Sequence, residues 1–181
     1  MIVSFPTSSM SAVVWSGFTF ALGIACKSVI DTYVQRREAV RKFAVEKRTA
    51  FLEQQLSRFY WPLYLHLQKD SLLQELRMER DQDPGSPKSI LSVYIESSDM
   101  LPNHKRATEV IETCLHLAGT VEVVNAAHQY ARHVMLYEML RAAGLEKEEP
   151  VSHGQGYPSN FFQLIEQRAR TLQDEYDSLI R

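Results

Sequence analysis

The chain begins with an apolar run that contains no charged side chain from Met1 to Cys26. Its most apolar part, residues 12–26, lies within residues 9–30. Residues 9–30 supply roughly the 20 residues that a helix needs to cross the hydrocarbon core of a bilayer. Lys27 follows near its end, where a long side chain can reach the lipid headgroups. The pattern predicts a single transmembrane helix, so that residues 1–30 form a short tail and a membrane anchor.

Three other interpretations of this run remain open. A cleaved signal peptide carries positive charge before its apolar part, but no basic residue precedes Lys27. A lipoprotein signal could use Cys26 but needs the same basic leader. The third interpretation is a buried helix of a soluble protein. We expect a retained anchor, because it explains both the length of the run and the charges that follow it.

Basic residues dominate the segment after the anchor, with seven basic and three acidic residues between Lys27 and Arg48. Lys and Arg near a membrane-spanning helix remain on the cytoplasmic side. They predict an N-terminus outside and a C-terminal domain on the cytoplasmic side of an inner or plasma membrane. No Gly or Pro interrupts residues 31–58, and their composition favours helix. Residues 31–60 are therefore predicted to form a basic helical stalk.

Apolar residues recur at helical spacing from residue 61 onward. Pro62 must end, restart or kink the helix that it enters. Residues 89–96 fit helix or strand, and the lack of a second strand to pair with them favours helix. The predicted fold is all-α, with an antiparallel helical bundle over residues 61–181. Its helices are expected near residues 62–79, 103–118, 120–143 and 160–180, and its loops at residues 81–88, 97–104 and 146–157.

Composition and charge narrow the function. The chain has 181 residues, 20 of them Lys or Arg and 22 Asp or Glu, which gives a net charge of −2. A general nucleic-acid-binding domain would be strongly basic, so we expect no nucleic-acid partner. The average conceals an uneven distribution, because the chain from Phe59 onward has 12 basic and 18 acidic residues, a net charge of −6. A basic stalk therefore precedes an acidic bundle.

Motifs for catalysis are missing. The chain has no Walker A loop, no dinucleotide fingerprint and no nucleophile elbow. Cys114 falls on an apolar helical stripe, where a cysteine usually acts as a small hydrophobe. His128 and His133 are five residues apart and point about 140° away from each other on a helix. We predict no catalytic residue, no cofactor and no metal ligand, and a zinc site assembled from separate helices is the alternative.

Polar and aromatic residues embedded in apolar segments are the candidates for an interaction surface. Trp and Tyr are common in binding hot spots, and buried histidines and arginines usually have a specific partner. The same residues could instead cap helices, pack around Pro62 or form hydrogen bonds between helices. The candidates are Trp61, His104, Arg132, His133, Arg141 and Tyr157.

Four short segments carry a resemblance to a class of proteins. They are FYWPLY at residues 59–64, LPNH at 101–104, YARH at 130–133 and YP at 157–158. Over residues 50–180 the chain resembles small single-pass bacterial membrane proteins that have a cytoplasmic helical domain and no assigned function. The resemblance implies the layout of anchor and helical domain, and it implies no activity.

These observations favour a membrane-tethered helical interaction or scaffold module without catalytic activity. It would contact the bilayer through residues 9–30 and bind an unknown membrane or cytosolic protein, or a second copy of itself as a homo-oligomer. A second hypothesis is a stress or phage-defence sensor or effector that acts at the membrane. A third is a metal-binding helical-bundle enzyme that uses the histidines.

Overall fold

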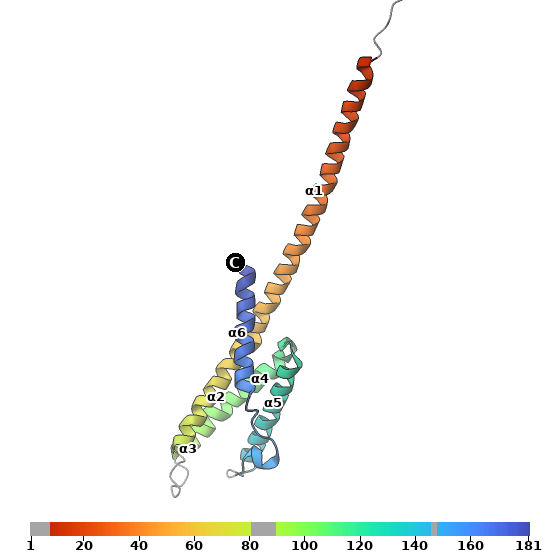
Figure 1. The fold of residues 1–181 in the computed structure, drawn as a ribbon. Coiled ribbons are helices and arrows are strands. Elements are labelled where there is room, and N and C mark those ends of the chain that lie inside the picture. Colours follow the sequence, from red (N-terminus) through yellow and green to blue (C-terminus); the bar gives the residue numbers. More distant parts are fainter. Residues whose placement is uncertain (1–7, 81–89, 146–147) are drawn as a thin grey trace, which may run out of the picture. The chain divides into compact units, whose positions relative to one another are not determined.

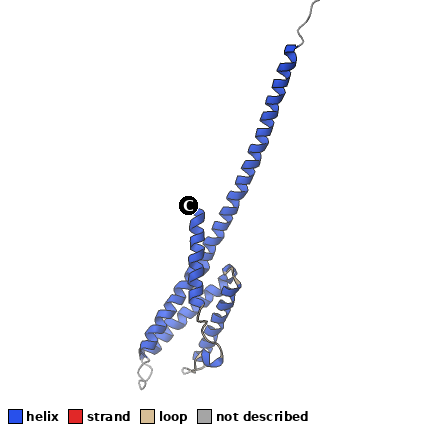
Figure 2. Ribbon diagram, in the orientation of Figure 1, coloured by secondary structure: helices blue, strands red, loops and turns tan. Residues whose placement is uncertain are grey.

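The computed structural model describes residues 8–80, 90–145 and 148–181, apart from the side chains of residues 8–26, 29, 77–80 and 90–91. The described residues form helices and connecting turns, and no strand occurs among them (Figure 2). The predicted all-α class is therefore confirmed. The chain divides into two compact units, residues 1–48 and 49–181.

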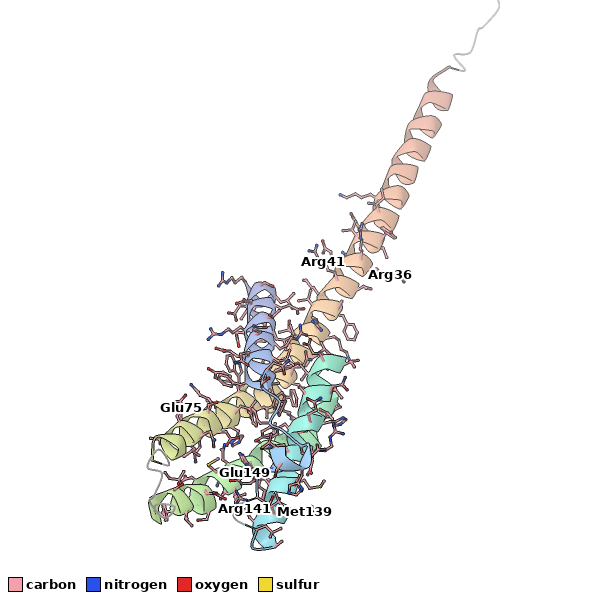
Figure 3. The ribbon with its side chains drawn as sticks, turned by 60° about the horizontal axis from the view of Figure 1, so that its bottom comes forward. Arg36, Arg41, Glu75, Met139, Arg141 and Glu149 are labelled. Atoms are coloured by element: carbon pink, nitrogen blue, oxygen red, sulfur yellow. The ribbon has the colours of Figure 1, made fainter. Side chains whose placement is uncertain are left out.

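The first unit consists of most of helix α1 (Ser8–Gln55). Side chains between residues 30 and 44 are exposed, among them Tyr33, Val40 and Phe43. Figure 3 shows Arg36 and Arg41 on this part of the helix. No helix among the described residues is long and apolar enough to cross a bilayer. The side chains of residues 9–26, which make up most of the predicted anchor, lie outside the described residues, so the predicted transmembrane helix has no support from the structure.

The second unit is a bundle in which consecutive long helices run in opposite directions (Figure 1). Helix α2 packs against α4 and α6, and α5 packs against the same two helices. Residues 89–96, for which the sequence left helix and strand open, contain helix. The elements are α2 (Trp61–Arg80), α3 (Ile90–Ile95), α4 (Leu101–Cys114), α5 (Val121–Ala142) and α6 (Phe161–Ile180).

A π-helical turn precedes each of the two helix-opening prolines. Leu56–Tyr60 leads into α2 before Pro62, and Glu96–Met100 leads into α4 before Pro102. The N–H of the residue after each turn, Trp61 or Leu101, donates to the carbonyl five residues before it. This bond widens the helix where the proline ring would crowd the preceding turn. The predicted loop at residues 97–104 is therefore wrong, because the chain remains helical there.

The core is made of apolar stripes with helical spacing. Residues 49–60, which the sequence placed in the stalk, contribute Leu52, Leu56, Phe59 and Tyr60 to it. Each large side chain buried in this way stabilises the fold by roughly 1.5–3 kcal/mol. The remaining helices supply Leu63 and Leu67, Ala107 and Ile111, Val123, Ala127 and Tyr130, and Phe161, Ile165 and Ala169.

Glycine and capping residues define the helix connections. Gly119 has φ +72° just before α5, and the Thr120 side chain accepts the Val123 N–H. Gly144 has φ +74° at the end of α5. Glycine adopts such angles without a Cβ penalty, and the two glycines directly follow the helices predicted for residues 103–118 and 120–143. Asn160 precedes α6, but its side chain makes none of the expected capping hydrogen bonds.

Candidate functional site

A cavity of about 290 Å³ lies within the second unit. It is bounded by α2, α4, α5 and the segment that leads into α6. Its floor includes the buried residues Asp70, Met100, His104 and Tyr137, and its more exposed rim includes Tyr157. The other lining residues are Ser71, Gln74, His133 and Glu149.

Asp70 is an acidic residue on the buried face of α2. Leu63 and Leu67 precede it at spacings of seven and three residues, so all three lie on one side of the helix. Only 5% of Asp70 is exposed. An isolated carboxylate at such a position would be strongly destabilising, so its partners decide whether the fold can hold it.

Three side chains from two other helices surround the Asp70 carboxylate. Asn103 Nδ2 donates to Oδ1 at 2.6 Å, and the Tyr130 hydroxyl donates to Oδ2 at 2.9 Å. His104 Nε2 lies 3.4 Å from Oδ2. Asn103 also donates to the backbone carbonyl of His66 at 2.8 Å, and its Oδ1 lies 2.8 Å from His66 Nδ1. The carboxylate is thus held by a network that ties α2 to α4 and α5.

Burial dominates the electrostatics of this cluster. It raises the pKa of Asp70, although the nearby His104 and the hydrogen bonds from Asn103 and Tyr130 act in the opposite direction. Burial and the Asp70 charge raise the pKa of Tyr130 well above its usual value. Burial and then Asp70 also raise the pKa of Tyr157, although 38% of that residue is exposed. Both tyrosines therefore remain neutral hydroxyl groups near the carboxylate.

Aromatic rings form much of the cavity wall. The His104 ring meets Tyr137 edge to face at 5.7 Å between centroids. The His133 ring stacks on Tyr137 at 6.2 Å between centroids and meets Tyr157 edge to face at 5.6 Å. The Nδ1 atom of His133 lies 2.8 Å from the Gln155 carbonyl, which orients the ring. The wall is therefore built from rings that hold one another in place.

Arg141 supports the cavity from the end of α5. Its guanidinium lies 4.4 Å from the centre of the Tyr137 ring, forms an ion pair with Glu96, and forms a second with Glu149 at 3.0 Å. Figure 3 shows Arg141 and Glu149 side by side. Burial alone would lower the pKa of Arg141, but Glu96 and Tyr137 raise it, so the group remains charged.

Four of the residues predicted for an interaction surface lie in or beside the wall of this cavity. His104, His133 and Tyr157 line it, and Arg141 supports its wall. Trp61 lies elsewhere and donates from Nε1 to Gln173 on α6 at 3.3 Å. Its ring also packs against Tyr64. The structure thus brings together residues that are far apart in the sequence, but in a cavity rather than on a flat surface.

Arg132 belongs to a different hollow. It is exposed and lines an open groove of about 590 Å³ between α4 and α5. The groove mixes charges of both signs, including Lys105, Glu109 and Glu138. Nothing in the structure indicates what would fill it.

The predicted site residues did not include Asp70, Asn103, Tyr130 or Tyr137, although the segments that contain Asn103 and Tyr130 were singled out. Asp70 had a detectable signal, because it continues the apolar stripe of Leu63 and Leu67 where a hydrophobic residue would be expected. Tyr130 and Tyr137 lie seven residues apart on the buried stripe of α5. Their aromatic character resembles that of ordinary core residues, so the pattern alone did not separate them from the core.

The cluster can hold a negative charge and a proton next to a cavity that opens to solvent. Among the described residues, no group of three or more His, Cys, Asp or Glu could hold a metal ion. In chemical terms the arrangement is a polar and aromatic binding cavity. No protein-family model matches the chain, and neither a curated protein nor a solved structure matches it significantly.

Proposed function

We propose that the chain is a membrane-tethered sensor whose helical domain binds a small molecule in the Asp70 cavity. One observation carries the proposal, namely that the cavity places a buried carboxylate and His104 next to a ring-lined space of about 290 Å³. Binding sites of proteins combine such apolar walls with a few fixed polar groups. A perturbed pKa inside a cleft is a further characteristic of functional sites.

The same helices that line the cavity give binding a route to the rest of the domain. The Asp70 network connects α2, α4 and α5, and Arg141 links α5 to Glu96 and Glu149. A ligand that prefers one packing of these helices would shift the balance between packings. The sensor would report this shift to a partner protein at the cytoplasmic face of the membrane.

The tether rests on the sequence. Residues 9–30 carry the apolar run, and basic residues follow it. Phe18→Arg places a charge near the middle of the run, where it opposes insertion by about 2.5–3.5 kcal/mol. We expect this variant to leave the membrane fraction. Ser9→Arg, at the edge of the run, should remain in the membrane fraction. Equal amounts of both variants in the membrane fraction would contradict the tether.

Ligand binding can be tested with a variant that fills the cavity. Ser71 lines it, and its hydroxyl bonds to the Leu67 carbonyl of its own helix. Ser57 makes the same kind of bond to the Glu53 carbonyl on an exposed face. Ser71→Leu should therefore block the cavity, while Ser57→Leu is its matched control.

The experiment is a thermal-shift screen of the full chain in mild detergent against metabolites of all charge types. We expect at least one compound to raise the melting temperature of the unchanged protein and of Ser57→Leu, but not of Ser71→Leu. A screen in which no compound stabilises the unchanged protein would contradict the sensor function.

A second function, the interaction or scaffold module, is favoured by an exposed apolar stripe on α2. Leu65, Leu72 and Leu76 are 60%, 55% and 46% exposed, at spacings of seven and four residues. Such a stripe is typical of a surface that contacts another protein. Replacing all three by Gln should abolish crosslinking to a partner or to a second copy in membranes. Unchanged crosslinking would exclude this stripe as the contact.

A further inference from the structure

We propose that the Asp70 cavity binds a compact organic ammonium ion, either as a free small molecule or as the headgroup of a lipid. The inference rests on the proposed ligand-binding function and specifies its ligand. Three properties of the cavity lead to it: the rings of its wall, the sign of its charge and its size.

The wall offers aromatic faces of the kind that attract cations. Tyr137 and Tyr157 both line the cavity, and His133 packs between them at 6.2 Å and 5.6 Å. Tyr157 also meets Tyr130 edge to face at 5.8 Å. Tyrosine faces carry negative charge density, and cages of such rings bind ammonium groups. Tyr137 already contacts one cation, the Arg141 guanidinium at 4.4 Å.

The charged groups at the cavity favour a cation over an anion. Its described lining contains the carboxylates Asp70 and Glu149, and no Lys or Arg. Arg141, the nearby cation, is occupied by Glu96 and Glu149 and by the carbonyls of Leu145 and Glu148. The two lining histidines already face acceptors of the protein, His104 the Asp70 carboxylate at 3.4 Å and His133 the Gln155 carbonyl at 2.8 Å. An incoming anion would therefore meet the carboxylates first.

The wider domain has the same sign. From Phe59 onward the chain has 12 basic and 18 acidic residues, and a negative domain attracts cations before they bind. The buried position of Asp70 adds to this preference. Burial raises its pKa, and a cation in the cavity would restore part of the stabilisation that the charged form loses by burial.

The size of the cavity limits the ligand. Its volume of about 290 Å³ lies at the lower end of the range for small-molecule sites, which is about 300–1,000 Å³. Such a space accepts an ammonium group with a short substituent. Gln74 and Ser71 at its lining could bond a hydroxyl group on that substituent.

The test compares probes of matched shape and different charge. The full chain is kept in maltoside micelles, which contain no ammonium group, and is titrated calorimetrically with choline, tetramethylammonium and ethanolamine. The neutral compound 3,3-dimethylbutan-1-ol has the shape of choline without its charge, and 3,3-dimethylbutanoate supplies the anion. We expect at least one ammonium ion to bind about tenfold more tightly than the neutral compound.

Two variants of Tyr157 show whether its ring is responsible. The residue is partly exposed and lies in a loop, so its replacement should leave the fold intact. Tyr157→Leu should reduce the preference for the ammonium ion to about twofold, because the cation–π contribution is lost. Tyr157→Phe keeps the ring and should keep the preference. Asp70→Asn should weaken ammonium binding, because it removes a negative charge from the cavity lining.

The outcomes separate the ligand class from the proposed function. If the metabolite screen finds ligands but none of the ammonium ions binds more tightly than the neutral compound or the anion, the ammonium proposal is overturned and the sensor function stands. If Tyr157→Leu keeps the full preference, the proposal is overturned as well. If no compound of any charge binds, both fail.

The source of the ammonium group is distinguished by nanodiscs of defined lipid. Weaker choline binding in phosphatidylcholine discs than in phosphatidylglycerol discs indicates that the lipid headgroup competes for the cavity. Equal binding in both discs indicates a free ammonium ion. Each result supports the proposed ligand class and identifies its source.

Discussion

Two buried tyrosines mark two regions of the same core. Tyr60 and Tyr130 are both completely buried. The Tyr60 hydroxyl donates to the Ala118 carbonyl, beside a bond of 2.7 Å from Gln55 Nε2 to the Leu117 carbonyl. The Tyr130 hydroxyl donates instead to the Asp70 carboxylate, next to the cavity.

The two tyrosines differ in the kind of acceptor that they bind, a backbone carbonyl for Tyr60 and a side-chain carboxylate for Tyr130. Carbonyl groups after the end of α4 have no partner within the helix, so Tyr60 and Gln55 satisfy bonds that the connection would otherwise lose. No backbone group requires Asp70 at its position. A buried carboxylate lowers stability compared with a well-packed apolar residue, and the proposed ligand-binding function accounts for its place beside a cavity.

The largest expected effect comes from removing the Asp70 carboxylate. Asp70→Ala leaves Asn103 and Tyr130 without their acceptor in a buried place, and we expect a loss of about 3–5 kcal/mol in the free energy of unfolding. Asp99 provides the control, because its ion pair with Lys69 is exposed on both sides. Asp99→Ala should change stability by less than about 1 kcal/mol in the same urea titration. Similar losses in both variants would contradict the network around Asp70.

A substitution at Gly119 tests the contacts around Tyr60 and Gln55. A Cβ atom there would lie 3.0 Å from Gln55 Nε2, at a φ of +72°. Gly154 has the same φ, but no heavy atom lies within 4 Å of its Cβ position. Gly154→Ala should therefore cost about 1–2 kcal/mol from backbone strain alone. Gly119→Ala should cost about 1 kcal/mol more, because it also disturbs the Gln55 bond. Equal melting temperatures of Gly119→Ala and Gly154→Ala would show that the close approach of Gln55 to Gly119 does not affect stability.

Removing the tyrosine hydroxyl groups compares the two regions directly. Tyr60→Phe and Tyr130→Phe should each lower the free energy of unfolding by about 1–2 kcal/mol, because each leaves a buried acceptor with one donor fewer. Only Tyr130→Phe should also change the affinity for an ammonium ion, since its partner lies at the cavity. Calorimetric titration of both variants checks this, and a changed affinity in Tyr60→Phe would remove the distinction.

The smallest expected effect is a dependence of stability on pH. Because the pKa of Asp70 is raised in the folded state, the folded protein binds this proton more tightly than the unfolded chain. The stability of the unchanged protein relative to Asp70→Asn should therefore be greatest at acidic pH. It should decline as the pH rises from about 4 through the raised pKa.

Titratable side chains from several elements face Asp70. The pKa of Asp70 is lowered by His104 on α4, by its hydrogen bond from Tyr130 and by His66 on α2. The Asp70 charge in turn raises the pKa of Tyr130 and Tyr157. Urea titrations between about pH 4 and 6 cover this decline. A relative stability that rises with pH in this range would contradict the raised pKa.

The sequence predicted the helices well where periodicity and glycine agreed. The helix predicted for residues 120–143 lies close to α5. Gly119 and Gly144 at its limits have positive φ, and the Thr120 side chain caps its start. Pro102 misled the prediction, because proline usually ends a helix. The π-helical turn at Glu96–Met100 absorbs the proline instead, and it forms through packing that local sequence does not encode.

The cavity was predictable only in part. His104, His133 and Tyr157 stood out as polar or aromatic residues in apolar segments, yet their sequence spacing gave no sign that they converge. Their meeting depends on how α4 and α5 pack and on the segment before α6. Asp70 lies more than thirty residues from Asn103 and sixty from Tyr130, so only the tertiary structure reveals the network.

The central claim is that the Tyr130 region binds a ligand while the Tyr60 region serves the fold. The most direct measurement is NMR of the full chain in maltoside micelles, with its tyrosine rings labelled with carbon-13, during addition of choline. The signals of Tyr137 and Tyr157 should shift in a saturable way, while those of Tyr60 and of Tyr33 in the first unit stay in place. Signals that do not move at all, or that move equally for Tyr60 and Tyr157, would contradict the account.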